Sequence, residues 1–337
     1  MTTDAASQPP PESPAKPIVL PDEPPIQRRH ELRIGNATLA YHSTTGMLPL
    51  KNAAGETEAQ IFFIAYTLNS PDGDLCRPLI IMFNGGPGAA SIYLHMGAFS
   101  PKRARLRDDG TIPPPPYQLL DNEYTLLAEA DMLYVDPVGT GYSRAAKEEL
   151  HKHYWSVKGD IESLAEFIRL YLNRYGRMTS PLFLCGESYG TFRAAGLAEH
   201  LLTKNIALSG LILVSAVLNF QASEYAKGND LPYALLLPTF TAAAWYHQKL
   251  PADLQSQPLR AAMVEAEHWA VGGYTLALMR GDLLSEAERA AVVIAWRATP
   301  AWSGATSSAA TCAYATPASS RSCCATNAVA FRPMMRA

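Results

Sequence analysis

An α/β fold, in which helices cover both faces of a mostly parallel sheet, is predicted by three observations on this sequence. Short apolar runs are typical of parallel strands buried on both faces, and four occur, at Pro78–Phe83, Met132–Val135, Leu182–Cys185 and Leu211–Leu218. Segments with helical periodicity, at 157–175 and 194–202, separate the later runs. Alternating apolar residues between 30 and 70 predict further strands ahead of the first run.

The third apolar run predicts a sharp turn that carries a serine. It leads directly into the pattern G-x-S-x-G, with the serine at Ser188, and a helical segment rich in alanine follows. A strand, this pattern and a helix are typical of the nucleophile elbow of an α/β-hydrolase. Gly186 and Gly190 fit because strand and helix approach too closely for a Cβ atom, and the backbone of Ser188 is expected to be strained. The alternative interpretation is a serine in an ordinary turn.

Length and composition exclude several classes of function. The 337 residues suffice for one α/β domain with an insertion, and the net charge of -3 offers no basic surface for nucleic acid. No apolar run reaches the ~20 residues needed to cross a bilayer, so no membrane partner is expected. The amino terminus lacks the layout of a signal peptide, which predicts a cytoplasmic location. The five cysteines show neither a disulfide framework nor zinc-ligand spacing, so we expect no metal and no other cofactor.

Changes in composition predict four segments. Residues 1–28 are rich in proline and are expected to be disordered, 29–230 form the α/β-hydrolase core, and 231–290 form a helical lid insertion. Residues 291–337 are interpreted as an aberrant, disordered tail, because more than half of the residues from Ala295 onward are Ala, Ser or Thr. We hypothesise that this composition comes from a GC-rich gene read out of frame. The last strands of the sheet are then expected to be missing.

Three motifs together resemble one family. They are Asn84–Gly88 (NGGPG), Asp136–Ser143 (DPVGTGYS) and Gly186–Gly190 (GESYG), in that order along the chain. In order and approximate spacing they are similar to those of the serine carboxypeptidases, over roughly residues 30–290, and Gly228–Pro232 is similar to bacterial members. The resemblance implies peptide substrates with a free C-terminus, hydrolysed at the last peptide bond through an acyl-enzyme on Ser188.

The resemblance also implies roles for the neighbouring residues. The backbone N–H of Tyr189 would donate to the oxyanion, and Gly86 holds the family's position for the second donor. The family's equivalents of Asn84 and Glu187 bind the terminal carboxylate, which requires a protonated glutamic acid because two adjacent carboxylates cannot both be ionised. The alternative interpretations are a tight turn at the glycine loop and a solvated Glu187. Where the family usually has a second glutamate, this sequence has His95.

An α/β-hydrolase triad runs serine, acid, histidine along the chain, so both partners should follow Ser188. The last histidine is His268 and the last acidic residue is Glu288, and both fall in the predicted lid. None of His200, His247 and His268 is expected to be the base. Three interpretations stay open: a serine carboxypeptidase; a truncated, inactive family member; and an esterase or acyltransferase on the same scaffold, which Glu187 disfavours.

Overall fold

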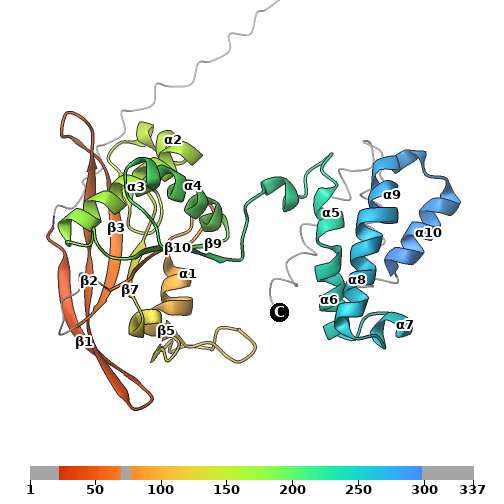
Figure 1. Cartoon of the computed structure of the whole chain (residues 1–337), viewed down its shortest axis with the longest axis horizontal. Coiled ribbons are helices and arrows are strands. Elements are labelled where there is room, and N and C mark those ends of the chain that lie inside the picture. Colours follow the sequence, from red (N-terminus) through yellow and green to blue (C-terminus); the bar gives the residue numbers. More distant parts are fainter. Residues whose placement is uncertain (1–22, 70–76, 298–337) are drawn as a thin grey trace, which may run out of the picture. The chain divides into compact units, whose positions relative to one another are not determined.

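The computed structural model describes residues 23–69 and 77–297, which divide into two compact units (Figure 1). The core unit contains the described residues up to Leu106 together with Ile112–Leu218. The helical unit contains Arg107–Thr111 and the described residues from Asn219 onward. Each unit has its own cluster of buried apolar residues.

The core unit is built on an eight-stranded sheet with the order β1-β2-β3-β7-β4-β9-β10, and β8 pairs beside β3. The first strands pair antiparallel, whereas β7, β4, β9 and β10 pair in parallel, which confirms the predicted α/β-hydrolase fold. Among the described residues β10 forms one edge of this sheet, and a separate small hairpin pairs β5 with β6. The strands are β1 Ile26–Ile34, β2 Ala37–Lys51, β3 Thr57–Leu68, β4 Leu79–Phe83, β5 Lys102–Ala104, β6 Leu119–Asp121, β7 Asp131–Val135, β8 Arg144–Ala145, β9 Leu182–Glu187 and β10 Gly210–Val214.

Strands β4 and β7 are buried on both faces and β9 is largely so, as their apolar sequences predict. For β10 the prediction was wrong, because this edge strand leaves Leu211 and Leu213 exposed on one face. Alternate residues of a strand point to opposite faces, so in β7 Leu133 and Val135 pack on one side and Met132 and Tyr134 on the other. Helices α3 (Val157–Arg174) and α4 (Tyr189–Thr203) cover the first face. The second face is covered by shorter elements, which are α1 (Ile92–Leu94), the π-helical turn η2 (His95–Phe99) and the 3₁₀ turn η3 (Leu126–Ala128).

The long helix α3 has the terminal signals that its sequence leads one to expect. The Ser156 hydroxyl accepts a hydrogen bond from the Gly159 N–H at 3.0 Å, which satisfies one of the unpaired donors of the first turn. After the last turn, Gly176 adopts a φ of 67°, a conformation that glycine tolerates and that ends a helix. The short helix α2 (His151–Tyr154), preceded by the 3₁₀ turn η4 (Glu148–Leu150), leads into it.

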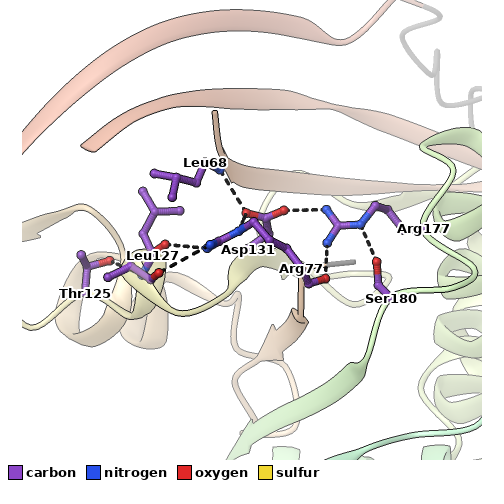
Figure 2. A network of polar contacts seen from close by, with 8 residues as sticks. Leu68, Arg77, Thr125, Leu127, Asp131, Arg177 and Ser180 are labelled. Atoms are coloured by element: carbon purple, nitrogen blue, oxygen red, sulfur yellow. Dashed lines mark hydrogen bonds and ion pairs between the residues drawn. The ribbon is translucent and has the colours of Figure 1, made fainter. Parts of the chain in front are cut away.

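A buried ion network joins the amino-terminal ends of the central strands (Figure 2). Asp131, fully buried at the start of β7, accepts hydrogen bonds from Arg177 at 2.6 Å and Arg77 at 3.1 Å. Arg177 also donates to the Ser180 hydroxyl and to the Arg77 carbonyl. Arg77 precedes β4, Asp131 begins β7 and Arg177 precedes β9. The network therefore joins three strands at their amino-terminal ends, whereas Ser188 follows the carboxyl end of β9.

The amino-terminal prediction needs a correction. β1 begins at Ile26 and pairs with Thr45 of β2, so disorder up to residue 28 was wrong for 26–28. Pro25 lies against Gly46, where a Cβ atom would approach its ring carbons to within 2.8 Å, so the missing side chain of glycine makes room for the incoming chain. The predicted disorder of 1–22 lies outside the described residues.

The helical unit consists of short helices joined by turns, and none of the described helices has the length and apolarity to span a bilayer. Its buried residues include Tyr274, against which Tyr233 and Trp269 pack, so these aromatics belong to the core of this unit. That the unit is a lid over the serine stays a prediction. Its helices are α5 Leu231–Leu235, α6 Leu237–Tyr246, α7 Ala252–Gln255, α8 Leu259–Trp269, η6 Ala270–Tyr274, α9 Thr275–Arg280, η7 Gly281–Leu283 and α10 Glu286–Arg297, with η5 Phe220–Ala222 ahead of them.

Both ends of the helical unit differ from the predicted boundaries. It begins at Asn219 and not after 230, because Asn229 donates to the carbonyls of Gln221 and Glu224 and folds this stretch onto itself. Helix α10 extends to Arg297, so the predicted tail was wrong for 291–297. A capping box starts α10, in which Ser285 and Glu288 exchange hydrogen bonds with each other's backbone N–H. The rest of the predicted tail, 298–337, lies outside the described residues.

Candidate active site

Ser188 lies at the tight turn between β9 and α4, with a φ of 57° and a ψ of -125°. A non-glycine residue with these angles is strained by about 1–3 kcal/mol, and such strain persists only where the surroundings enforce it. Here the Ser188 N–H donates to the Val214 carbonyl at 3.0 Å, and its carbonyl accepts from the Thr191 N–H at 2.9 Å. The predicted strained elbow is confirmed, and its side chain is only partly buried.

The two glycines of the elbow are required by close packing, as the sequence predicts. A Cβ atom on Gly186 would overlap the Gly190 carbonyl, and one on Gly190 would lie 2.8 Å from the Phe83 carbonyl oxygen. Both neighbours are backbone atoms, so neither can move without displacing a strand or a helix. The turn therefore fits only with glycine at both positions.

The glycine loop Asn84–Gly88 lies directly against the elbow. A Cβ atom on Gly85 would lie 2.5 Å from the Tyr189 nitrogen and 2.7 Å from the Glu187 carbonyl oxygen. Gly86 follows with a φ of +102°, which favours glycine. The structure thus brings Gly86, Tyr189 and Ser188 into one small region, although the oxyanion-hole roles of Gly86 and Tyr189 stay predictions.

Asn84 and Glu187 are joined by a hydrogen bond, and their predicted role as a carboxylate site stays a prediction. The Asn84 Nδ2 donates to Glu187 Oε2 at 3.0 Å, and the Asn84 Oδ1 accepts from the Leu94 N–H at 3.0 Å. Asn84 is fully buried, whereas Glu187 is partly exposed. Because both ends of the amide are bonded, its orientation is fixed and the N–H₂ group faces the carboxyl group.

The third motif, Asp136–Ser143, supports the segment that follows the glycine loop. The buried Asp136 carboxylate accepts from the Ser91 N–H at 2.9 Å, and the Ser143 hydroxyl donates to the Asp136 carbonyl at 2.6 Å. A Cβ atom on Gly141 would overlap the Asp136 carboxylate. Burial raises the pKa of Asp136, and the backbone donors only partly oppose this. The sequence identified the motif, but not this contact.

His95, which the resemblance aligns with a second glutamate of the family, is buried; that equivalence stays a prediction. Its Nε2 and the Tyr66 hydroxyl share a hydrogen bond of 2.7 Å, and its ring lies 4.6 Å from that of Tyr134. Burial lowers the pKa of His95 to about 4, so the imidazole is neutral near pH 7. The core thus holds at this position a neutral ring that is bonded to a tyrosine.

Sequence reasoning missed the pair formed by Arg193 and Asp160. Arg193, on α4, is 2% exposed and donates to Asp160 of α3 at 2.8 Å. Burial raises the pKa of the Asp160 carboxyl, and the charge of Arg193 opposes this effect. One signal was present, because Asp160 falls between Val157 and Leu164 on the apolar stripe of its helix, where an unpaired charge is too costly to bury.

The catalytic acid and base are not found in the described core. Among the described residues, none forms a hydrogen bond with the Ser188 hydroxyl, and His30 and His95 bond to Ser43 and Tyr66 instead. His200 lies on α4 about 18 Å along the helix from the serine, at ~1.5 Å per residue, and cannot reach it. His247 and His268 belong to the helical unit. The described core therefore contains Ser188 and the loops that surround it, and the role of Ser188 as nucleophile stays a prediction.

Comparisons with known proteins agree with these motifs. Residues 36–252 match the family model described as serine carboxypeptidase. The chain is 28% identical over 213 residues to a serine carboxypeptidase-like protein, number 45, of Arabidopsis thaliana, covering 57% of this chain and 43% of the relative. It is 29% identical over 174 residues to a pheromone-processing carboxypeptidase of Saccharomyces cerevisiae, covering 48% of this chain and 22% of the relative.

Among solved structures, a prohormone-processing carboxypeptidase of Saccharomyces cerevisiae aligns with 78% of this chain and 54% of its own, at 20% identity and a TM-score of 0.47. The chain thus spans less than half the length of the two curated relatives named above. The family model nevertheless covers most of the chain, including all three motifs around Ser188. On this evidence the chain belongs to the serine carboxypeptidase family.

Proposed function

We propose that this protein is a serine carboxypeptidase that uses Ser188 as its nucleophile. The Ser188 oxygen attacks the carbonyl carbon of the last peptide bond, the C–N bond breaks, and the C-terminal amino acid leaves with a proton on its new amine. Water then hydrolyses the acyl-enzyme and restores the serine. The observation that carries the proposal is the strained Ser188, with a φ of 57°, held against the glycine loop and beside the Asn84–Glu187 pair.

Stabilisation of the oxyanion is assigned to two backbone N–H groups, those of Tyr189 and Gly86. The approach of Gly85 to the Tyr189 nitrogen supports this assignment, because it places the two chain segments side by side. A backbone donor costs nothing to reorganise during the reaction, and the loss of one such donor typically slows catalysis by ~10²–10³-fold.

Recognition of the substrate's free C-terminus is assigned to Asn84 and Glu187. The fixed Asn84 amide donates to the glutamate, and a protonated Glu187 would donate in turn to the substrate carboxylate. Two ionised carboxylates in hydrogen-bonding contact would repel each other, so the proposal includes a preference for acidic conditions. The family implies peptide substrates, and a free C-terminus is the feature that this pair would select.

The proposal is tested with three matched substrates across pH 4 to 8: a blocked dipeptide with a free C-terminus, its C-terminal amide, and a short acyl ester. We expect hydrolysis of the free acid at acidic pH and little cleavage of the amide. Glu187→Gln keeps a neutral donor and should flatten the pH dependence, whereas Glu187→Ala should raise KM for the free acid. Faster cleavage of the ester, with no effect of either variant on the free acid, would favour the esterase or acyltransferase.

A second candidate is a family member that binds peptides without cleaving them. It is favoured by one observation, that no described residue forms a hydrogen bond with the Ser188 hydroxyl. Binding of the blocked dipeptide, measured by calorimetry, without any turnover of it would support this candidate. Turnover that disappears in Ser188→Ala would exclude it.

A further inference from the structure

Arg193 forms buried contacts beside the proposed site that the proposed function does not use. We propose that Arg193 is a positioning residue, which holds the glycine loop Asn84–Gly88 in place against the elbow. This inference rests on the proposed function only for its catalytic consequence. The contacts themselves belong to the fold of the core unit.

The guanidinium group of Arg193 joins three separate parts of the chain. Its Nε donates to Asp160 on α3 at 2.8 Å, and its Nη1 donates to the carbonyl of Asn84, the first residue of the glycine loop, at 2.6 Å. Arg193 itself lies on α4, the helix that begins at the nucleophile. A single side chain therefore links the elbow helix, the neighbouring helix and the loop.

Two aromatic rings enclose the same group. The guanidinium carbon lies 5.0 Å from the ring centre of Tyr189 and 5.5 Å from that of Phe83, the last residue of β4. The Tyr189 hydroxyl also bonds to Asp160. The rings exclude water from a charged hydrogen bond, which strengthens it because the local dielectric constant is low. Arg193 has no freedom to leave, since its side chain is 2% exposed.

The bond to Asn84 is placed where it controls the geometry of the loop. A carbonyl and the N–H of the following residue belong to one rigid peptide plane. Holding the Asn84 carbonyl therefore fixes the Gly85 N–H and the direction in which the chain enters Gly86, the proposed oxyanion donor. It also fixes the backbone from which the Asn84 side chain reaches Glu187. One cation thus aligns both the oxyanion donor and the carboxylate pair.

The core unit contains a matched control for this proposal. Arg177 is also buried, bonds to an acidic residue and donates to a backbone carbonyl (Figure 2). It precedes β9, whereas Ser188 follows that strand, so Arg177 lies at the opposite end of the sheet. Arg177→Gln and Arg193→Gln each remove a buried ion pair and should each lower the stability of the core. Only Arg193→Gln removes a contact to the glycine loop.

Amide hydrogen exchange tests the positioning role without requiring any activity. The reporters are the N–H groups of Ala89 and Leu94, which donate to the Gly85 carbonyl and the Asn84 side chain. We expect Arg193→Gln to speed their exchange by about tenfold or more, the loss typical of a bond to a charged group. Arg177→Gln should leave them unchanged. Equal protection in the wild type and Arg193→Gln, or equal loss in both variants, would overturn the proposal.

A second variant covers the case in which Arg193→Gln does not fold. Arg193→Lys keeps the charge opposite Asp160 but lacks the planar fork that reaches both Asp160 and Asn84. It should fold and still speed the exchange of Ala89 and Leu94, and unchanged exchange in this variant would equally reject the proposal.

The catalytic consequence is read separately, from the rate at which a fluorophosphonate labels Ser188. We expect both Arg193 variants to lower this rate by ~10²-fold, in line with the cost of a misplaced donor, while Arg177→Gln labels at the wild-type rate. Where the enzyme turns over a blocked dipeptide, kcat should fall more than KM rises. If the wild type itself is not labelled, the proposed function fails while the exchange result still decides the role of Arg193. If an Arg193 variant shows faster exchange of Ala89 and Leu94 but labels at the wild-type rate, Arg193 positions the loop without affecting catalysis.

Discussion

The buried imidazole of His95 should make the stability of the core unit depend on pH. Burial lowers its pKa to about 4 from an ordinary value of 6.5. In the pH range between these values the unfolded chain binds a proton that the folded chain does not, so acid favours unfolding. The contribution of the neutral His95 to the free energy of unfolding is therefore fully present above pH 6.5, and it is lost as the pH falls towards 4.

The size of the effect follows from the two pKa values. At ~1.4 kcal/mol for each pH unit, the whole loss amounts to about 3 kcal/mol, of which about 2 kcal/mol is already lost at pH 5. His95→Gln removes the titration but keeps an amide that can bond to the Tyr66 hydroxyl. The variant should be less stable than the wild type at pH 7, because its side chain fits less well, and the difference should shrink by about 2 kcal/mol at pH 5.

The free energy of unfolding is measured by urea denaturation at pH 7 and pH 5. Hydrogen exchange of the amides in β4 and β9 serves as the probe, so that unfolding of the core unit is followed separately from that of the helical unit. His200→Gln on α4 serves as a control for the loss of an imidazole from a less buried position. A difference between wild type and His95→Gln that is the same at both pH values would refute the assignment of a neutral, buried His95.

Further predictions concern the ion network, the elbow and the buried thiol. Asp131→Ala leaves two buried arginines without their partner and should cost about 3–5 kcal/mol in urea unfolding, whereas Lys102→Ala, which breaks an exposed pair, should cost at most ~1 kcal/mol. Gly190→Ala places a Cβ atom 2.8 Å from the Phe83 carbonyl oxygen, and it should lower the rate of fluorophosphonate labelling of Ser188 by ~10²-fold. Gly97→Ala is the control, because a Cβ atom there meets nothing within 4 Å, and it should label at the wild-type rate. Burial raises the pKa of Cys185 to about 12, so peptide mapping should find this thiol unmodified by iodoacetamide at pH 8 in the folded protein and modified in urea, and rapid native modification would contradict the burial.

The parallel strands and the elbow could be predicted because the sequence encodes them locally. The apolar runs that became β4, β7 and β9 are typical of strands buried on both faces. The similar run that became β10 lies at a sheet edge among the described residues, so its apolarity did not predict the exposure of Leu211 and Leu213. Gly186 and Gly190 are needed because a Cβ atom at either position would clash with the backbone, as it would wherever a helix follows a strand through so tight a turn. Both features depend on residues adjacent in sequence, so one sequence suffices to identify them.

Contacts between distant segments were not predictable in the same way. Arg193 and Asn84 meet only once the sheet order places β4 beside β9, and nothing near either residue in sequence indicates the other. The Asp131 network likewise joins residues from three strand ends. The predicted boundaries of the amino-terminal segment and of the tail were wrong although local signals were present. These signals are the capping box of α10 and the fit of Pro25 against Gly46, and the unusual composition of both termini obscured them.

Mass spectrometry of the intact protein after treatment with a fluorophosphonate tests whether Ser188 is the nucleophile. We expect a single adduct, located on the peptide that contains Ser188 and absent from Ser188→Ala. A folded protein that acquires no adduct at Ser188 under a large excess of reagent, or that is labelled equally well in Ser188→Ala, would contradict it.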